Sequence, residues 1–257
     1  MIRQQWQAFL LAVSFLTKIP VDSITRKSPD SFQQSVGYFS VVGAMVGAIG
    51  ALTFVLIHYF IHSPALSVLG SMLATVWVTG SFHEDGLADT ADGLWGGHDR
   101  ERRLEIMKDS RIGTHGSLAL WFGMTAKFIL LLELSKAGIW ILVTTLISAH
   151  AMGRGGSLLL MIVQSYARRE DSSKSVPFVN NPSKLACLVG FLFAATLAIL
   201  LNHRQGMVGI AAVVLITLLC GRYYHRKIGG VTGDCLGATC QIAEVCYYLA
   251  AILLINN

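Results

Sequence analysis

Three aspartates are spaced at i, i+4 and i+7 in a chain that is otherwise mostly apolar. They are Asp85, Asp89 and Asp92, in the segment 83–116, which is rich in acidic, basic and glycine residues. If this segment is helical, the three carboxylates share one face and repel one another. A hard divalent cation such as Mg²⁺ prefers carboxylate oxygens and would reverse that repulsion. The spacing predicts a metal site, and a solvated acidic helix face is the alternative.

A second charged group follows the aspartates within the same segment. Lys108, Asp109 and Arg111 supply a fourth carboxylate and two cations. Acidic residues that hold a metal, next to basic residues that hold phosphate, are typical of phosphoryl-transfer sites. The segment as a whole therefore indicates phosphoryl-transfer chemistry.

A third stretch, GGVTGDCLGA at 229–238, combines glycines with an acid. Gly229, Gly230 and Gly233 would let backbone N–H groups approach an anion, and Asp234 opens the last apolar run. A flexible loop that ends in an N-cap aspartate is the plainer interpretation. We favour the functional interpretation because the stretch is predicted on the same membrane face as the three aspartates.

Two histidines, His83 and His115, bracket the acidic and basic segment. His83 could orient a metal-bound acid, and His115 could bind phosphate, although either could instead form an interfacial hydrogen bond. No HExxH motif occurs, which excludes a zincin. The five cysteines show no CxxC or Cys/His ligand spacing, so we expect reduced thiols rather than a zinc site.

Four charged residues fall inside predicted apolar spans. Charge is costly there, so each side chain should face a partner or a polar cavity. Lys127 with Glu133 and Arg154 with Glu244 are the pairs that we expect. Structural and functional roles are equally open for these pairs.

The composition predicts a membrane protein. Of 257 residues, 53% are hydrophobic and 14% are charged, with mean hydropathy +0.57, whereas soluble domains carry about 25% charge. Apolar runs recur at about the 20 residues that cross a bilayer as a helix. We expect an all-α, polytopic transmembrane bundle in a single domain, 1–257. Its seven predicted spans are 36–60, 66–82, 118–134, 139–163, 185–201, 208–220 and 236–255.

The N-terminus resembles a signal peptide but lacks a small-x-small cleavage site. Its apolar residues form a stripe at helical spacing, made of Trp6, Phe9, Leu10, Val13 and Leu16. The stripe predicts an interfacial helix that is retained in the mature protein and contacts membrane lipid.

The distribution of charge predicts the orientation. The net charge is +5, but the basic residues lie in loops between apolar spans, which favours orientation in a membrane over nucleic-acid binding. With seven spans, most of the 20 Lys and Arg residues share the N-terminal side, including those in the polar loops 165–183 and 222–234. That side is predicted to be cytoplasmic. Gly43, Gly47 and Gly50 in the first span also make a homo-oligomer conceivable.

Four sequence elements together resemble the cobalamin synthase family, the adenosylcobinamide-GDP ribazoletransferases. They are HEDGLADTADGL at 83–94, RRLEIMKDSRIGTHG at 102–116, GGVTGD at 229–234 and SFLTKIP at 14–20. The likeness runs from about Phe9 to the last span, and its central motif is long and specific. Departures are small: Lys18 stands where arginine is common, Glu84 occupies a variable position, and Cys235 follows the TGD aspartate.

The resemblance implies a transferase of cobalamin biosynthesis in the bacterial cytoplasmic (inner) membrane. Members join adenosylcobinamide-GDP to α-ribazole or its 5′-phosphate. GMP leaves, and adenosylcobalamin or its phosphate forms. The family uses Mg²⁺, and its partners are these small substrates and membrane lipid, without nucleic acid.

Roles for individual residues follow from this reaction as hypotheses. Asp85, Asp89 and Asp92 would bind one or two Mg²⁺ ions at the diphosphate. Asp109 would complete the metal shell or accept the ribazole hydroxyl proton. Arg111 would neutralise the transferred phosphoryl group, for which its planar fork suits better than lysine. The catalytic set is Asp109, Arg111, Asp89 and His83, and the substrate-binding set is Lys108, His115, Lys18, Gly230, Gly233, Asp234 and Arg154.

Two other functions agree less well with the sequence. A CDP-alcohol-type phosphotransferase would show a DG…AR…G…D…D order, but no AR element follows Asp92 at the required spacing. A membrane transporter commonly shows internal repeats or broken helices, and the two halves of this sequence do not match. Its acidic residues also cluster in one predicted cytoplasmic stretch rather than at mid-membrane.

Overall fold

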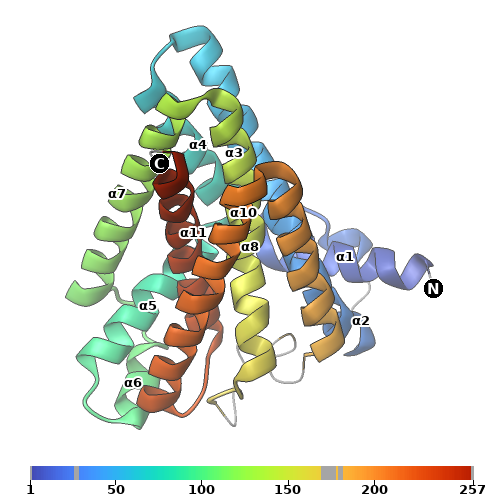
Figure 1. Cartoon of the computed structure of the whole chain (residues 1–257). Coiled ribbons are helices and arrows are strands. Elements are labelled where there is room, and N and C mark those ends of the chain that lie inside the picture. Colours follow the sequence, from blue (N-terminus) through green and yellow to red (C-terminus); the bar gives the residue numbers. More distant parts are fainter. Residues whose placement is uncertain (1, 26–28, 169–177, 179–181, 256–257) are drawn as a thin grey trace.

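The computed structural model describes residues 2–25, 29–168, 178 and 182–255, and it is helical apart from one parallel bridge between Tyr166 and Val231 (Figure 1). The predicted polar loop 165–183 lies largely outside the described residues. The helices are α1 (Ile2–Leu16), α2 (Pro29–Ser35), α3 (Phe39–Ile61), α4 (Pro64–Thr79), α5 (Phe82–Gly96), α6 (Arg100–Ile106), α7 (Thr114–Ala137), α8 (Ile139–Val163), α10 (Lys184–Ile228) and α11 (Gly233–Ile255), with 3₁₀ turns at Asp22–Ile24 and Val36–Tyr38.

The described helices confirm a multi-pass membrane bundle. Five are long and apolar enough to cross a bilayer, or six if α4 and α5 form one bent span. The helix α10 is a hairpin, because His203 departs from helical geometry at φ 47° and ψ −117°. The backbone of Gly206 is consequently packed against that of Ala198. This turn divides α10 into arms 184–202 and 204–228 (Figure 1), and the spans are roughly consistent in number with the seven predicted.

The second predicted span ends earlier than expected. The helix α4 starts at Pro64, behind the N-cap Ser63, and ends at Gly80, whose φ of 63° is left-handed. Ser81 is also left-handed, at φ 59°, and the axis of α5 then departs from that of α4 by 86°. The three aspartates therefore lie on a separate helix beyond a sharp bend.

Two further expectations need correction. The predicted loop 222–234 is helical as far as Ile228 and ends at Gly229, with φ 76°. Two glycines of the first span pack α3 against α8. A Cβ added at Gly43 would lie 2.4 Å from His150 O, and a Cβ added at Gly47 would lie 2.8 Å from Ile147 Cα. That face is therefore occupied within the chain and cannot pair with a second copy.

The helix α1 forms as predicted, but most of its apolar stripe faces protein. Leu10, Val13 and Leu16 are buried, and only Trp6 is largely exposed. In Figure 1, α1 lies across the bundle rather than along it. This arrangement is consistent with an interfacial helix that is fastened to the bundle by its apolar side.

The motif-bearing segments gather at one end of the bundle (Figure 1). Arg100 on α6 donates to Ala167 O at 2.6 Å and to Ile228 O at 3.0 Å. Arg103 on the same helix donates to Lys227 O at 3.1 Å. The short helix α6 is thus tied to the end of α10 and to the segment that follows α8.

We predict that this end of the bundle is accessible from a single side of the membrane. Single cysteines at the exposed positions Glu101 and Arg226 should react with an impermeant maleimide from one side. Cysteines at His62 and Lys136, in the connections at the opposite end, should react from the other side. Labelling of Glu101→Cys and Arg226→Cys from opposite sides would contradict the fold.

Candidate active site

The helix α5 is placed by a close crossing with α11. A Cβ at Gly86 would lie 2.9 Å from Asp234 O and 3.2 Å from Gly237 Cα, so the crossing requires glycine. Gly93 is similarly tight, because a Cβ there would lie 2.9 Å from Arg103 O. Glycine disfavours helices, but here it allows backbones to approach. The face of α5 that packs against α11 and α6 is therefore next to the face that carries the aspartates.

The three predicted aspartates lie on α5 with graded exposure. Asp85 is exposed, Asp89 is partly buried, and Asp92 is buried. The strongest charged neighbours of Asp89 are the carboxylates of Asp85, Asp92 and Asp234 and the guanidinium of Arg168. Only Arg168 among them is positively charged. The α5–α11 crossing thus adds a carboxylate from the glycine-rich stretch to the helical ladder.

Asp92 has a structural role that its sequence spacing did not indicate. Its Oδ2 accepts from Gly113 N at 2.7 Å, and its Oδ1 accepts from Gly116 N at 2.8 Å. These amides belong to the N-terminus of α7, where a negative charge is stabilised by the helix dipole. Asp92 therefore joins α5 to α7, and both its oxygens already have a hydrogen-bond donor.

The glycine-rich stretch is built differently from an open anion-binding loop. A Cβ at Gly230 would lie 2.3 Å from Ser165 O, and Val231 N donates to that same oxygen at 3.0 Å. Asp234 Oδ2 accepts from Thr232 Oγ1 at 3.2 Å and from Arg168 Nη2 at 3.3 Å. The glycines pair this segment with the end of α8, and Gly233 starts the helix that presents Asp234.

The donor set is chemically suited to Mg²⁺. Asp85, Asp89 and Asp234 offer hard carboxylate oxygens, and their mutual repulsion would be relieved by a divalent cation. Within the described part of the chain, no three His, Cys, Asp or Glu side chains lie in an arrangement that could hold a metal ion. The carboxylates fit such an ion in charge and chemistry.

Asp109 and Arg111 pair with each other at the surface. Arg111 Nη2 lies 2.6 Å from Asp109 Oδ2, and Arg111 Nε donates to both carboxylate oxygens. Hydrogen bonds from Arg111 lower the pKa of Asp109 to about 2. A general base works best with a pKa near the operating pH, so this pairing disfavours Asp109 as the proton acceptor.

The other basic candidates lie around the same end of the bundle. Lys108, with Arg100 and Arg168, lines an open cavity beside α6. Arg168 also contacts Asp234, so this cavity adjoins the carboxylates. His115 is exposed on the first turn of α7, and its ring meets that of Trp95 edge-on at 6.0 Å.

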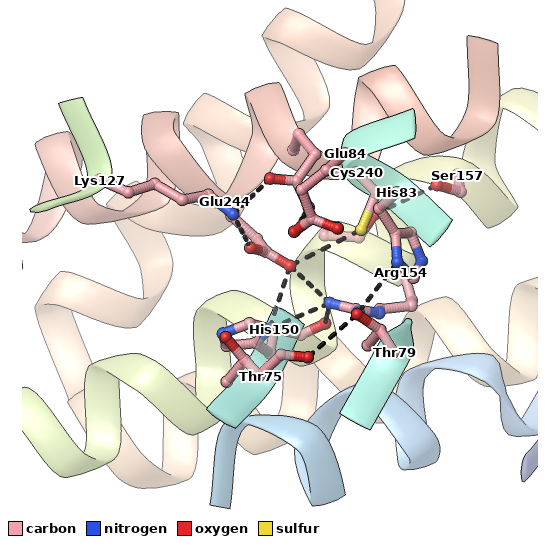
Figure 2. Close-up of polar contacts among 12 residues, drawn as sticks. Thr75, Thr79, His83, Glu84, Lys127, His150, Arg154, Ser157, Cys240 and Glu244 are labelled. Atoms are coloured by element: carbon pink, nitrogen blue, oxygen red, sulfur yellow. Dashed lines mark hydrogen bonds and ion pairs between the residues drawn. The ribbon is translucent and has the colours of Figure 1, made fainter. Parts of the chain in front are cut away.

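His83 and Arg154 belong to a buried charge network (Figure 2). Arg154 Nη1 and Lys127 Nζ each lie 2.5 Å from Glu244, on separate carboxylate oxygens. His150 Nδ1 lies 3.1 Å from the same carboxylate, and His83 Nδ1 lies 3.4 Å from Arg154 Nη2. The expected Arg154–Glu244 pair is confirmed, and the network joins α5, α7, α8 and α11.

The expected pair of Lys127 with Glu133 is wrong. Glu133 instead binds Lys136 at 2.7 Å, three residues along the same helix, which the i, i+3 spacing could have indicated. Lys127 also donates to Gln241 at 2.6 Å, and Gln241 donates to Glu84 at 3.1 Å. Sequence reasoning missed Gln241 and Glu84, because no spacing rule links helices so distant along the chain.

Lys18 lies beside the bend between α4 and α5. Its backbone N–H donates to Val78 O at 2.7 Å, and its aliphatic stem passes directly over Gly80. The predicted substrate-binding element at 14–20 is thus fixed against the bend from which α5 starts.

Comparison with known proteins gives one consistent result. A family model described as cobalamin-5-phosphate synthase matches residues 8–252. An adenosylcobinamide-GDP ribazoletransferase of Shewanella woodyi is 43% identical over 250 residues, which cover 96% of each chain. One from Vibrio cholerae is 40% identical over 258 residues, covering 100% of this chain and 97% of the relative. No solved structure matches the chain significantly.

We predict different effects on stability for two aspartates of the ladder. Asp92→Ala should destabilise the fold by about 1–2 kcal/mol, because two amides at the start of α7 lose their acceptor. Asp85→Ala should be neutral or slightly stabilising, because an exposed charge that is repelled by its neighbours is removed. Thermal unfolding in detergent without divalent ions measures both. Equal shifts in Tm would contradict the assigned role of Asp92.

The buried network predicts a larger effect. Glu244→Gln should destabilise by about 3–5 kcal/mol, because Lys127 and Arg154 lose their shared counter-charge. Lys127→Met should cost less, since Glu244 would still bind Arg154. Chemical unfolding in mixed micelles compares the two variants. A more severe loss from Lys127→Met would show that Glu244 is not the centre of the network.

Proposed function

This chain belongs to the cobalamin-5-phosphate synthase family, and on that premise we propose how it acts as an adenosylcobinamide-GDP ribazoletransferase. The supporting observation is a family match over residues 8–252, together with relatives of that name at 36–43% identity over nearly the full length. The reaction joins adenosylcobinamide-GDP to α-ribazole or its 5′-phosphate and belongs to cobalamin biosynthesis.

The chemistry is a phosphoryl transfer. A ribazole hydroxyl oxygen forms a bond to the phosphorus that is attached to cobinamide. The bond from that phosphorus to the bridging oxygen of the diphosphate breaks, and GMP leaves with the electron pair. The hydroxyl proton passes to a base. The protein must therefore position two anionic groups and stabilise negative charge on the leaving phosphate.

Carboxylates at the α5–α11 crossing support a Mg²⁺ site. Asp85, Asp89 and Asp234 would hold the ion, and Asp92 would fix α5 against α7 through its two amide contacts. Mg²⁺ supplies Lewis-acid stabilisation of phosphate oxygens when it is bound.

Basic residues on the other side of the carboxylates would hold the nucleotide. Arg168 contacts Asp234 and, with Arg100 and Lys108, lines the open cavity beside α6. We assign this cavity to the guanosine diphosphate portion of the corrinoid substrate. Arg111 would exchange Asp109 for a substrate phosphate, which its exposed position allows.

The site is assigned to the cytoplasmic face of the bacterial inner membrane. The bundle is multi-pass, and its motif-bearing end carries α6 and its arginines, in keeping with an excess of basic residues on the cytoplasmic side. Both substrates would then reach the carboxylates from the cytosol without crossing the membrane.

We predict that Asp89→Asn reduces GMP release at least about 100-fold, because a charge that acts on the transition state is lost. Membranes with the variant are incubated with adenosylcobinamide-GDP, α-ribazole 5′-phosphate and Mg²⁺, and GMP and corrinoid product are quantified. Glu133→Gln is the control, since Glu133 is exposed near the far end of α7 and pairs with Lys136 in a surface salt bridge. Near-normal turnover by Asp89→Asn, with the control unchanged, would remove the ladder from the mechanism.

A further inference from the structure

A cavity of about 650 Å³ lies where the segment that follows α1 passes the bend between α4 and α5. Its apolar walls come from three helices, with Phe15 on α1, Phe32 on α2 and Phe82 on α5, and its polar lining includes Lys18 and Asp22. Ligand pockets commonly enclose about 300–1,000 Å³ and combine apolar walls with a few polar groups. The cavity has the size and lining of a small-molecule site. It is separate from the basic cavity beside α6, because the two linings have no described residue in common.

Phenylalanine rings form one wall of this cavity. The ring of Phe15 meets that of Phe82 edge-on at 5.1 Å and stacks on that of Phe178 at 4.0 Å, and Phe32 meets Phe178 edge-on at 5.0 Å. Phe15 and Phe32 are half-buried and Phe82 is 36% exposed, so part of the ring surface is accessible as the structure stands. Aromatic side chains of this kind stack on planar heterocycles.

Lys18 adds a positive charge to the lining of the cavity. Its backbone N–H donates to Val78 O at 2.7 Å, and its stem crosses Gly80 so closely that an added Cβ there would collide with Lys18 Cε. Asp22 lines the same cavity, but its carboxylate accepts from Ser14 Oγ at 2.5 Å. Within the described residues, the Lys18 ammonium group has no ion-pair partner. It is therefore a positioned cation that is available to an anionic ligand.

The cavity adjoins the carboxylates of the candidate active site along α5. Asp85 follows Phe82 by three residues and Asp89 follows it by seven, so the three side chains lie on one side of the helix. At 1.5 Å per residue, Asp89 is about 10 Å from Phe82 along the helix axis. A nucleoside whose base lies against Phe82 would bring its ribose hydroxyls toward Asp85 and Asp89, where a hydroxyl group must react.

We propose that this cavity binds α-ribazole 5′-phosphate, with the benzimidazole base on the phenylalanine rings and the 5′-phosphate on Lys18. The proposal rests on the proposed function and adds the residue that selects the phosphorylated form of its second substrate. A benzimidazole base is planar and mostly apolar, and a phosphate monoester is an anion that lysine binds as a point charge. Guanine would need several polar partners along its edge, and the amide groups around cobinamide would be left unpaired by these rings.

Substrate preference in a Lys18 variant tests the phosphate contact. GMP release is measured with α-ribazole 5′-phosphate and with α-ribazole, and the preference is the ratio of the two kcat/KM values, which a general loss of folded enzyme does not change. Wild-type enzyme should prefer the phosphorylated substrate. Lys18→Met should lower that preference at least about tenfold, because a charge-assisted contact is lost, and Lys18→Arg should retain it.

Lys136→Met is the matched control, because Lys136 pairs with Glu133 at the opposite end of the bundle, and it should keep the wild-type preference. The same preference in Lys18→Met as in the wild-type enzyme, or an equal fall in Lys136→Met, would overturn the assignment of Lys18. So would a wild-type enzyme that uses the two ribazole substrates equally well.

A variant of the aromatic wall tests where the base lies. Phe82→Ala should raise the KM for α-ribazole and for its 5′-phosphate about tenfold each and change the KM for adenosylcobinamide-GDP less than about twofold, since a stacking contact is lost only for the base. Phe122→Ala is the matched control, because Phe122 is 61% exposed on α7. Unchanged KM values for the ribazole substrates, or an equal rise for the corrinoid substrate, would contradict the site. Absence of GMP release from the wild-type enzyme with either ribazole substrate would instead refute the proposed function.

Discussion

The position of α5 depends on one buried carboxylate, that of Glu244. It is fully buried and neutralises Lys127 from α7 and Arg154 from α8, and Gln241, one turn earlier on α11, reaches Glu84 on α5. A buried charge is tolerated only when it is paired and hydrogen-bonded, so these helices cannot shift independently. The network thereby fixes the start of α5 at the level where it bends away from α4.

A close glycine contact and a helix-capping aspartate complete the site. The Gly86–Gly237 contact brings α5 against the first turns of α11, and Asp92 holds α7 through two backbone amides. Repulsive carboxylates are thus held together by apolar packing and helix capping rather than by their own interactions. This arrangement of repelling carboxylates is the basis of the Mg²⁺ site that we propose for a reaction between two anionic substrates. The basic cavity beside α6 adjoins these carboxylates through Arg168, which contacts Asp234.

Much of the fold followed from local pattern. Helix α8 coincides with the predicted span 139–163, and the turn at His203 separates the two arms of α10 as expected. The bend at Gly80 and Ser81 was missed, because two consecutive left-handed residues have no reliable signature when one of them is serine. The capping role of Asp92 and the Lys127–Glu244 pair were also missed, since both depend on helices meeting in space.

Binding of Mn²⁺, followed by electron paramagnetic resonance, tests most directly whether the α5 and α11 carboxylates form a divalent-cation site. Purified wild-type protein should bind Mn²⁺ that excess Mg²⁺ displaces. Asp89→Asn and Asp234→Asn should each weaken that binding at least about tenfold, whereas Glu133→Gln should leave it unchanged. Undiminished Mn²⁺ affinity in both aspartate variants would contradict the account.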